Sequence, residues 1–269
     1  MMFCPHSGVT GKKVRNAGHY IGLRRDLIKQ IDLSDQDRQL FLDSHNNLRR
    51  SVNAKNMQYV TWNSKLEELA RNWTSQCTFD HRPSFTIIID GTPFVGENIF
   101  ASEEVAMPPY NIPVEAWFGE QPCFNHSSGS CSDDCATCAH YVQIVRHDSS
   151  EIGCAASRCR FVDTLPPSHV GVYQVVVCNY ILFGNWVTGG LYQLPFIPAK
   201  SANELCSQCP KEKAGCYQGL CINKDQLPTT TPAPWSTTSK AVQANQQSLL
   251  NVLITGVFNL AVNFAISLL

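Results

Sequence analysis

The cysteines are the side chains of this sequence that could do the most varied chemistry, from disulfide formation to metal binding. The chain has 269 residues and 13 cysteines, and 12 of these lie between Cys77 and Cys221. Thiols at this density either pair as disulfides in an oxidising compartment or bind metal ions in a reducing one. The pattern therefore predicts a fold stabilised by covalent bridges or by metal, and other features must decide between them.

Two groups of cysteines keep the metal and redox alternatives open. Four thiolates near the end of the cysteine-rich region would suit zinc, namely Cys206, Cys209, Cys216 and Cys221. Cys135 and Cys138 have the Cys-x-x-Cys spacing of a redox-active pair. Against both stand N-glycosylation sequons at Asn72 and Asn125, which are used only in the secretory pathway. We therefore favour disulfides and predict glycans at both asparagines.

The two ends of the chain differ in their targeting signals. Residues 1–29 are basic and lack the apolar core of a secretory signal, which we interpret as an alternative start of an exported chain. A cytosolic protein is the alternative. Near the other end, residues 227–239 are rich in Pro and Thr, as in an extended stalk. A polar spacer and the apolar tail Leu249–Leu269 follow, which favours a GPI-anchor signal over a transmembrane helix.

The overall composition is that of an ordinary globular protein. Hydrophobic residues make up 43% and charged residues 16%, so the chain can form a core of normal size. The formal net charge is −1, and no basic field favours nucleic acid. We therefore predict no nucleic-acid partner.

Hydrophobic spacing predicts helices in the first half of the chain and strands in the second. The first helix begins at Ser34, the second has a capping-box sequence at Ser64–Glu67, and a third begins near Pro113. Three later segments are rich in β-branched residues: 140–145, 152–155 and 172–178. Helices followed by strands predict an α+β arrangement with a small, mostly antiparallel sheet.

Six short motifs occur in the order found in one protein superfamily. They are His45-Asn-Asn-Leu-Arg49, Cys77-Thr-Phe-Asp-His81, Gly96-Glu-Asn-Ile99, Trp117-Phe-Gly-Glu120, Ala139-His-Tyr-Val-Gln-Ile-Val145, and Val176-Val-Cys-Asn-Tyr180 with Gly184-Asn185. Together they resemble the CAP superfamily of cysteine-rich secretory, antigen 5 and pathogenesis-related 1 proteins. The later cysteines, stalk and tail are most similar to the glioma pathogenesis-related protein 1-like branch. The sequence departs from the family pattern around the expected cleft, at Ala139, Arg146 and Leu182.

The resemblance implies a three-layer α/β/α sandwich with a small, mainly antiparallel sheet, followed by a short disulfide-rich hinge. On this basis we divide the chain into five parts. They are an atypical N-terminal segment (1–33), a CAP domain (34–200), a cysteine-rich hinge (201–224), a Pro/Thr-rich stalk (225–248) and a hydrophobic tail (249–269).

The resemblance also implies four disulfides. These are Cys77–Cys159 and Cys154–Cys178 in the domain, and Cys206–Cys216 and Cys209–Cys221 in the hinge. A further bridge of many relatives has lost both partners here, since Val95 and Ile181 stand in their places. Four cysteines remain for two local bridges of open pairing, namely Cys123, Cys131, Cys135 and Cys138. Cys4 is left over.

The family places two histidines and two glutamates in a central cleft. Carried over residue by residue, this tetrad is His81, Glu97, Glu120 and His140. His81 and His140 are candidate ligands for weakly held Zn²⁺ or Mg²⁺, although no cofactor is required. Alternatively, the pairs only satisfy each other's hydrogen bonds. No motif places a nucleophile beside them, and catalytic zinc usually has three protein ligands, so we predict no catalytic residue and no enzyme.

Three hypotheses for function follow. We favour a non-enzymatic protein of the extracellular space or cell surface, tail-anchored, that presents its cleft and hinge to a lipid or protein partner in reproduction or immunity. The second is a sterol- or fatty-acid-binding protein, which rests on the resemblance alone. The third is a metal-dependent hydrolase with Glu97 or Glu120 as its base.

Overall fold

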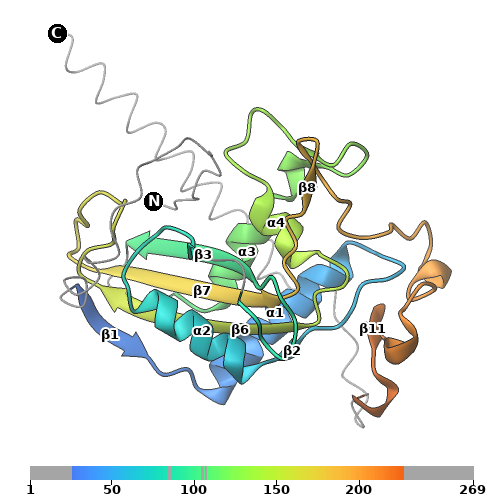
Figure 1. Ribbon diagram of the computed structural model, residues 1–269, viewed down its shortest axis with the longest axis horizontal. Helices are drawn as coiled ribbons and strands as arrows, with labels where there is room; N and C mark the ends of the chain where they lie inside the picture. Colours follow the sequence, from blue (N-terminus) through green and yellow to red (C-terminus); the bar gives the residue numbers. More distant parts are fainter. Residues whose placement is uncertain (1–25, 84–86, 104–105, 107, 227–269) are drawn as a thin grey trace. The chain divides into compact units, whose positions relative to one another are not determined.

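A five-stranded sheet forms the centre of the described fold, and its strands β3, β7 and β6 run side by side in Figure 1. The computed structural model describes residues 26–83, 87–103, 106 and 108–226. The strand order is β1-β6-β7-β3, and β2 pairs with β6 in parallel. The strands are β1 (Leu27–Ile31), β2 (Thr61–Trp62), β3 (Gly96–Glu103), β6 (Glu151–Cys159) and β7 (Tyr173–Ile181). The pairs β1–β6, β6–β7 and β7–β3 are antiparallel, as predicted.

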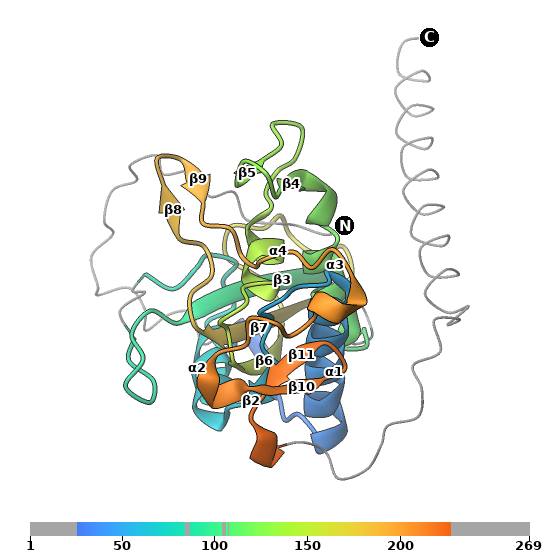
Figure 2. The same cartoon turned by 90° about the vertical axis from the view of Figure 1, so that its right-hand side faces the viewer.

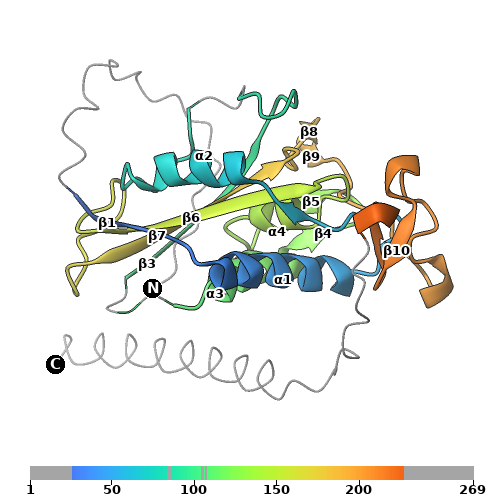
Figure 3. The same cartoon turned by 90° about the horizontal axis from the view of Figure 1, so that it is seen from below.

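Helices cover both faces of the sheet, which gives the three layers visible in Figure 3. α2 (Ser64–Thr74) lies on one face, and α1 (Asp35–Ser51), α3 (Asn111–Phe118) and α4 (Ala139–Ile144) lie on the other. Alternate residues of β7 face the two layers. Val175 and Val177 belong to the same buried cluster as Ala70 of α2, whereas Val176 belongs to the cluster that contains Phe41 of α1. This alternation explains why every residue of β7 is buried.

The N-terminal caps of α1 and α2 show how far the local sequence predicts where a helix begins. Ser34 caps α1 in a reciprocal capping box with Asp37, so the predicted start is confirmed. At α2 the prediction was wrong by one residue, because the side chain of Asn63 rather than Ser64 caps the helix. Glu67 is not part of a capping box, since its carboxylate instead accepts hydrogen bonds from Arg38 and Trp62.

The prediction of an extended segment at 140–145 was wrong, because residues 140–144 lie in α4 and Val145 is its C-cap. The backbone N–H groups of His140 and Tyr141, in the first turn of α4, donate to the carboxylate of Glu120. A carboxylate at a helix N-terminus satisfies donors that have no partner within the helix. This tertiary contact outweighs the β propensity of a segment that contains Val142 and Ile144.

Elements on both sides of the segment assigned to the CAP domain contact the core of that segment. β1 precedes the predicted boundary at Ser34, yet it pairs with β6 along its length. The hinge hairpin, β10 (Gly215–Tyr217) and β11 (Leu220–Ile222), packs on the segment that follows α1. There Cys221 N donates to Met57 O, and Leu220 is fully buried in the main core. Hinge and domain therefore share one core.

Two smaller hairpins meet beyond α4, as seen at the top of Figure 2. They are β4 (Phe124–Asn125) with β5 (Ser130–Cys131), and β8 (Val187–Thr188) with β9 (Leu191–Tyr192). Tyr192 N donates to Gly129 O and so joins them. Four 3₁₀ turns complete the described elements: Gln121–Cys123, Ala202–Glu204, Lys211–Lys213 and Lys224–Gln226.

The described part of the chain contains no helix with both the length and the apolar character needed to span a bilayer. Except for Asp225 and Gln226, the predicted stalk lies outside the described residues, as do the hydrophobic tail and Cys4.

Candidate functional site

The first motif of the sequence has a structural role. His45 is completely buried, its Nδ1 lies 2.8 Å from Phe41 O, and its Nε2 lies 2.9 Å from the Tyr180 hydroxyl. Because a carbonyl oxygen can only accept, Nδ1 carries the proton and Nε2 accepts from the tyrosine. Burial lowers the pKa of His45 to about 4, so the ring is neutral at physiological pH.

Arg49, from the same motif, connects α1 by hydrogen bonds to the segment at Gln58 and to residues 144–149. Its buried guanidinium donates to the carbonyl oxygens of Gln58, Ile144, Arg146, His147 and Ser149. Burial lowers the pKa of Arg49 to about 9, which still leaves it charged at neutral pH. The motif thus fixes the position of α4 and the loop after it.

His81 and Glu97 form the first pair of the tetrad. His81 Nδ1 lies 3.1 Å from Glu97 Oε1, and Arg82 N donates to the same oxygen at 3.1 Å. The second oxygen, Oε2, is 3.3 Å from Nη2 of Arg82 and accepts from Asn179 Nδ2 at 3.5 Å. Sequence reasoning named Asn179 only as one letter of a motif and did not name Arg82, although a basic residue directly after His81 was a readable signal.

The partners of Glu97 keep its carboxylate ionised. Burial alone would raise its pKa, but the hydrogen bond from His81 and the charge of Arg82 outweigh burial, and the pKa is lowered. A general base works best with a pKa near the working pH. Glu97 is therefore a poor candidate for proton transfer at neutral pH.

Glu120 and His140 form the second pair, on the layer that contains α3 and α4. His140 Nδ1 lies 2.6 Å from Glu120 Oε1, while the other carboxylate oxygen accepts from the N–H groups of His140 and Tyr141. The His140 ring stacks on Trp117, with 6.3 Å between ring centroids. The pair is buried, and its carboxylate holds the start of the helix that carries the histidine.

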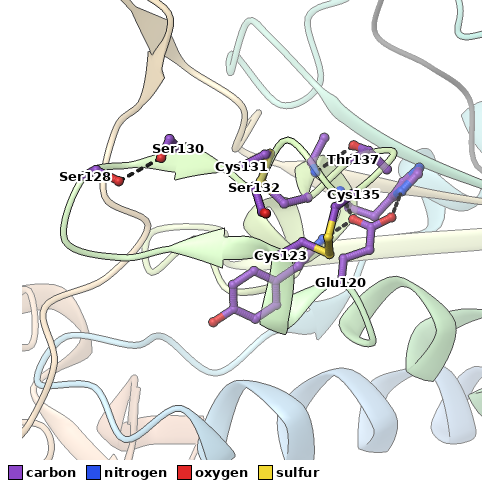
Figure 4. The surroundings of a disulfide bond; sticks show 12 residues. Glu120, Cys123, Ser128, Ser130, Cys131, Ser132, Cys135 and Thr137 are labelled. Carbon is purple, nitrogen blue, oxygen red and sulfur yellow. Dashed lines mark hydrogen bonds and ion pairs between the residues drawn. A yellow bond between two sulfur atoms is a disulfide. The ribbon is translucent and has the colours of Figure 1, made fainter.

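Two disulfides clamp the loop that separates Glu120 from His140. The bridges are Cys123–Cys135 and Cys131–Cys138, which resolves the pairing that the sequence left open. Figure 4 shows Glu120 beside this clamped loop, with the Ser128 and Ser130 hydroxyls in contact at its tip. Because Cys138 directly precedes α4, the loop fixes His140 covalently as well as through Glu120.

β3 connects the two pairs. Glu97 belongs to the first pair, and the next residue, Asn98, donates from Nδ2 to His140 O. Successive strand residues point to opposite faces, so the pairs approach β3 from different sides. Each histidine uses Nδ1 for its carboxylate, and within the described residues neither Nε2 has a hydrogen-bond partner. A carboxylate on one ring nitrogen with the other free is the arrangement of metal-binding histidines.

The tetrad nevertheless does not form a site with three converging ligands. In the part of the chain that the structure describes, only Cys206, Cys209 and Cys221 bring three ligand atoms within 4.8 Å of one another. Their sulfurs are engaged in the bridges Cys206–Cys216 and Cys209–Cys221, so they offer no thiolates to zinc.

The structure also contains the other two bridges implied by the resemblance. Cys154 and Cys178 are bonded directly opposite each other on β6 and β7. Cys77–Cys159 ties the segment after α2 to the end of β6. At the place of the lost bridge, Val95 and Ile181 are buried in one apolar cluster with Leu66.

Both sequon asparagines are exposed. Asn72 lies near the end of α2, and the hydroxyl of Thr74 in the same sequon donates to Arg71 O and accepts from Ser157. Asn125 lies in the clamped loop, where its Oδ1 accepts from the N–H groups of Ser127 and Ser128. Glycans at these positions would project from the surface.

Comparison with known proteins shows a family match over half of the chain. A family described as "CAP: Cysteine-rich secretory protein family" matches residues 42–180. Mouse cysteine-rich secretory protein LCCL domain-containing 1 is 32% identical over 227 residues, or 80% of this chain and 42% of the relative. The chain thus spans less than half the length of that relative.

Two shorter relatives are matched over more of their own length. Mouse peptidase inhibitor R3HDML is 30% identical over 210 residues, or 71% of this chain and 76% of the relative. Mouse glioma pathogenesis-related protein 1 is 32% identical over 188 residues, or 68% and 64%.

Solved structures with the same fold are more distant in sequence. Na-ASP-1 superposes with a TM-score of 0.54 at 18% identity, over 79% of this chain and 52% of that one. A structure described as NaASP2 with Zn²⁺ superposes with a TM-score of 0.50 at 24% identity, over 70% and 96%. At these identities the likeness shows the fold alone.

Proposed function

Since this chain belongs to the cysteine-rich secretory protein (CAP) family, we propose that it is a non-enzymatic extracellular protein that binds a protein partner. The observation that carries the proposal is the use of the tetrad carboxylates. Glu97 and Glu120 each accept backbone N–H groups in addition to a histidine, so they fix loops around β3. Groups committed to such bonds support a rigid surface better than proton transfer.

The extracellular part of the proposal is supported by oxidation and by the relatives. Six disulfides occur in the described residues, and such bridges persist outside the reducing cytosol. Relatives of this chain are named as secretory proteins. We extend the proposal to glycans at Asn72 and Asn125 and to a GPI anchor at the apolar tail.

An extracellular peptidase is the partner class that we put first, because one relative is named as a peptidase inhibitor. The full chain, exported to the surface of animal cells behind a heterologous leader, is incubated with serine and cysteine peptidases and fluorogenic peptides. We expect it to slow at least one peptidase, and to cleave no peptide itself with or without zinc. Cleavage by the chain that the His140→Ala variant loses would refute the non-enzymatic proposal. No inhibition of any peptidase, with saturable uptake of labelled cholesterol, would favour the lipid alternative.

The anchor has its own experiment. The chain is displayed on animal cells and treated with phosphatidylinositol-specific phospholipase C. We expect release into the medium together with a mass decrease after N-glycosidase treatment. Retention on phospholipase-treated cells would favour a transmembrane tail instead.

A further inference from the structure

The two bridges of the hinge lie side by side. They are Cys206–Cys216 and Cys209–Cys221, and the sulfurs of Cys206, Cys209 and Cys221 all lie within 4.8 Å of one another. One sulfur of the first bridge is therefore a near neighbour of both sulfurs of the second. Thiol–disulfide exchange needs this proximity, because a thiolate must reach a disulfide sulfur to displace the other one.

The same four cysteines can also pair within their own segments. Cys206 and Cys209 are joined by a turn, in which Cys209 N donates to Cys206 O at 3.4 Å, and they have the Cys-x-x-Cys spacing of redox-active pairs. Cys216 and Cys221 lie directly opposite each other on β10 and β11. Opposed residues of an antiparallel pair have their side chains on the same face, close to bridging distance.

The central sheet already contains a bridge between opposed strand residues. Cys154 and Cys178 lie opposite each other on β6 and β7 and are bonded to each other. Such a pair is thus compatible with a disulfide in this chain. The opposed pair of the hinge is instead bonded to Cys206 and Cys209, so its own bridge is an unused alternative.

Exposure determines where exchange begins. Cys216 is exposed, Cys206 and Cys209 are half-buried, and Cys221 is completely buried. A thiol from the solvent therefore attacks the first bridge at Cys216 and leaves the thiolate on Cys206. That thiolate is already placed beside both sulfurs of the second bridge.

We propose that the hinge is a thiol–disulfide exchange site, which low-molecular-weight thiols convert between two pairings. The thiolate of such a compound attacks Cys216 Sγ, forms a mixed disulfide and displaces the Cys206 thiolate. Cys206 Sγ then attacks Cys209 Sγ, which forms Cys206–Cys209 and displaces the Cys221 thiolate. Finally, Cys221 Sγ attacks Cys216 Sγ, which closes Cys216–Cys221 and returns the small thiolate. Each step forms one S–S bond and breaks one, so the thiol is a catalyst and the protein is neither oxidised nor reduced.

The two pairings differ in how they constrain residues 210–215. In the described pairing these residues lie inside both disulfide-closed rings, and in the alternative pairing they lie outside both. Each half of the hinge has its own contact with the domain, since Gln208 N donates to Lys55 O and Cys221 N donates to Met57 O. Exchange therefore releases this segment and leaves the hinge attached. This inference goes beyond the proposed partner-binding function, and its test needs no partner.

Peptide mapping of the full oxidised chain tests the proposal. The chain is incubated with a small amount of reduced glutathione, its free thiols are blocked by alkylation, and it is digested with trypsin in urea without reduction. Trypsin cuts the hinge into peptides 201–211 and 214–224, of which the first contains the Cys-x-x-Cys pair and the second the opposed pair. The described pairing links these two peptides. The alternative pairing leaves them apart, each with an internal bridge.

We expect glutathione to cause a loss of the linked peptides and an equal gain of the two separate peptides, without alkyl groups. A sample incubated without glutathione should keep the linked peptides. The internal control is Cys154–Cys178, which links peptides 147–158 and 161–200. Both of its cysteines are completely buried, so this link should persist under the same treatment.

A variant without the first bridge shows whether exchange is relayed. In Cys206→Ala/Cys216→Ala no thiolate can form beside Cys209 and Cys221, so the hinge peptides should stay linked in the presence of glutathione. Equal loss of the link in this variant would mean that the solvent thiol reaches the second bridge directly, and it would refute the relay.

Two results from the wild type alone would overturn the proposal, even if the variant does not fold. One is persistence of the linked hinge peptides, in either of the two pairings that cross-link them. The other is separation into peptides that carry alkyl groups, which would show reduction of the bridges instead of exchange between them.

Discussion

His45 gives the folded chain a specific sensitivity to acid. Its pKa is about 4 in the folded chain and 6.5 ordinarily, so the unfolded state binds the extra proton between these values. Stability from this residue is therefore complete above pH 6.5 and is lost as the pH falls toward 4. The loss amounts to about 3 kcal/mol. Urea unfolding between pH 7.5 and 4.5 should show it, with these pH values chosen as approximate limits of the window.

His45→Gln provides the control for this prediction. It should be less stable than the wild type at neutral pH, because it leaves the buried Tyr180 hydroxyl with a poorer partner. Its stability should change less across the same window. An equally steep loss in His45→Gln would assign the effect to another group that titrates in this window, such as His147, whose pKa is also lowered by burial.

At the scale of single residues, the resemblance supplied the four tetrad residues because its motifs contain them. It did not say which histidine meets which glutamate, nor which other residues contact them. Asn179 was noted only as a motif letter, because its contact with Glu97 joins residues 82 apart in the chain. Arg82 was missed although it directly follows His81, because no motif includes it. Arg49 was noted only as a motif letter, since no pattern shows that one guanidinium will reach the carbonyl groups of two separate loops.

Among the larger elements, the disulfide-closed loops should differ in their effect on stability. Cys77–Cys159 spans 82 residues and Cys131–Cys138 spans 7. Because the entropy that a bridge removes from the unfolded chain rises with loop length, we expect the double Ala variant of the long bridge to lose about 4.5 kcal/mol. The short bridge should contribute about 2.5 kcal/mol.

Guanidinium unfolding of the two double Ala variants, with the wild type beside them, measures this difference. The order of the two losses is the decisive result. A larger loss from the short bridge would mean that the clamped loop stabilises the folded state directly, through its hold on α4.

The secondary structure was predictable where neighbours in sequence decide it. The α1 cap depends on adjacent residues and β7 on a run of β-branched residues, and both were found. β6 was found only in part, since the prediction covered residues 152–155 of Glu151–Cys159. α4 was not found, because Glu120 anchors its start from another segment. β1 was not found either, since its five residues gain their stability only from pairing with β6.

For the molecule as a whole, the hinge should unfold together with the domain. Leu220 of β11 is fully buried in the main core, so Leu220→Ala should cost about 2–5 kcal/mol. Hydrogen exchange read by mass spectrometry should then rise in β6 and β7 as well as in the hinge. Leu191→Ala, at an exposed position, is the control and should leave exchange unchanged. Faster exchange confined to the hinge would show that the two parts unfold separately.

The order of the bridges along the chain also decides how the molecule bears tension. A force that reaches Cys77 along the backbone passes through the first bridge to Cys159. It then follows the backbone back to Cys154 and passes through the second bridge to Cys178. Residues 78–153 and 160–177 lie outside this covalent path. All four tetrad residues lie in the first of these segments, so a pull applied before Cys77 and after Cys178 reaches them only through non-covalent contacts.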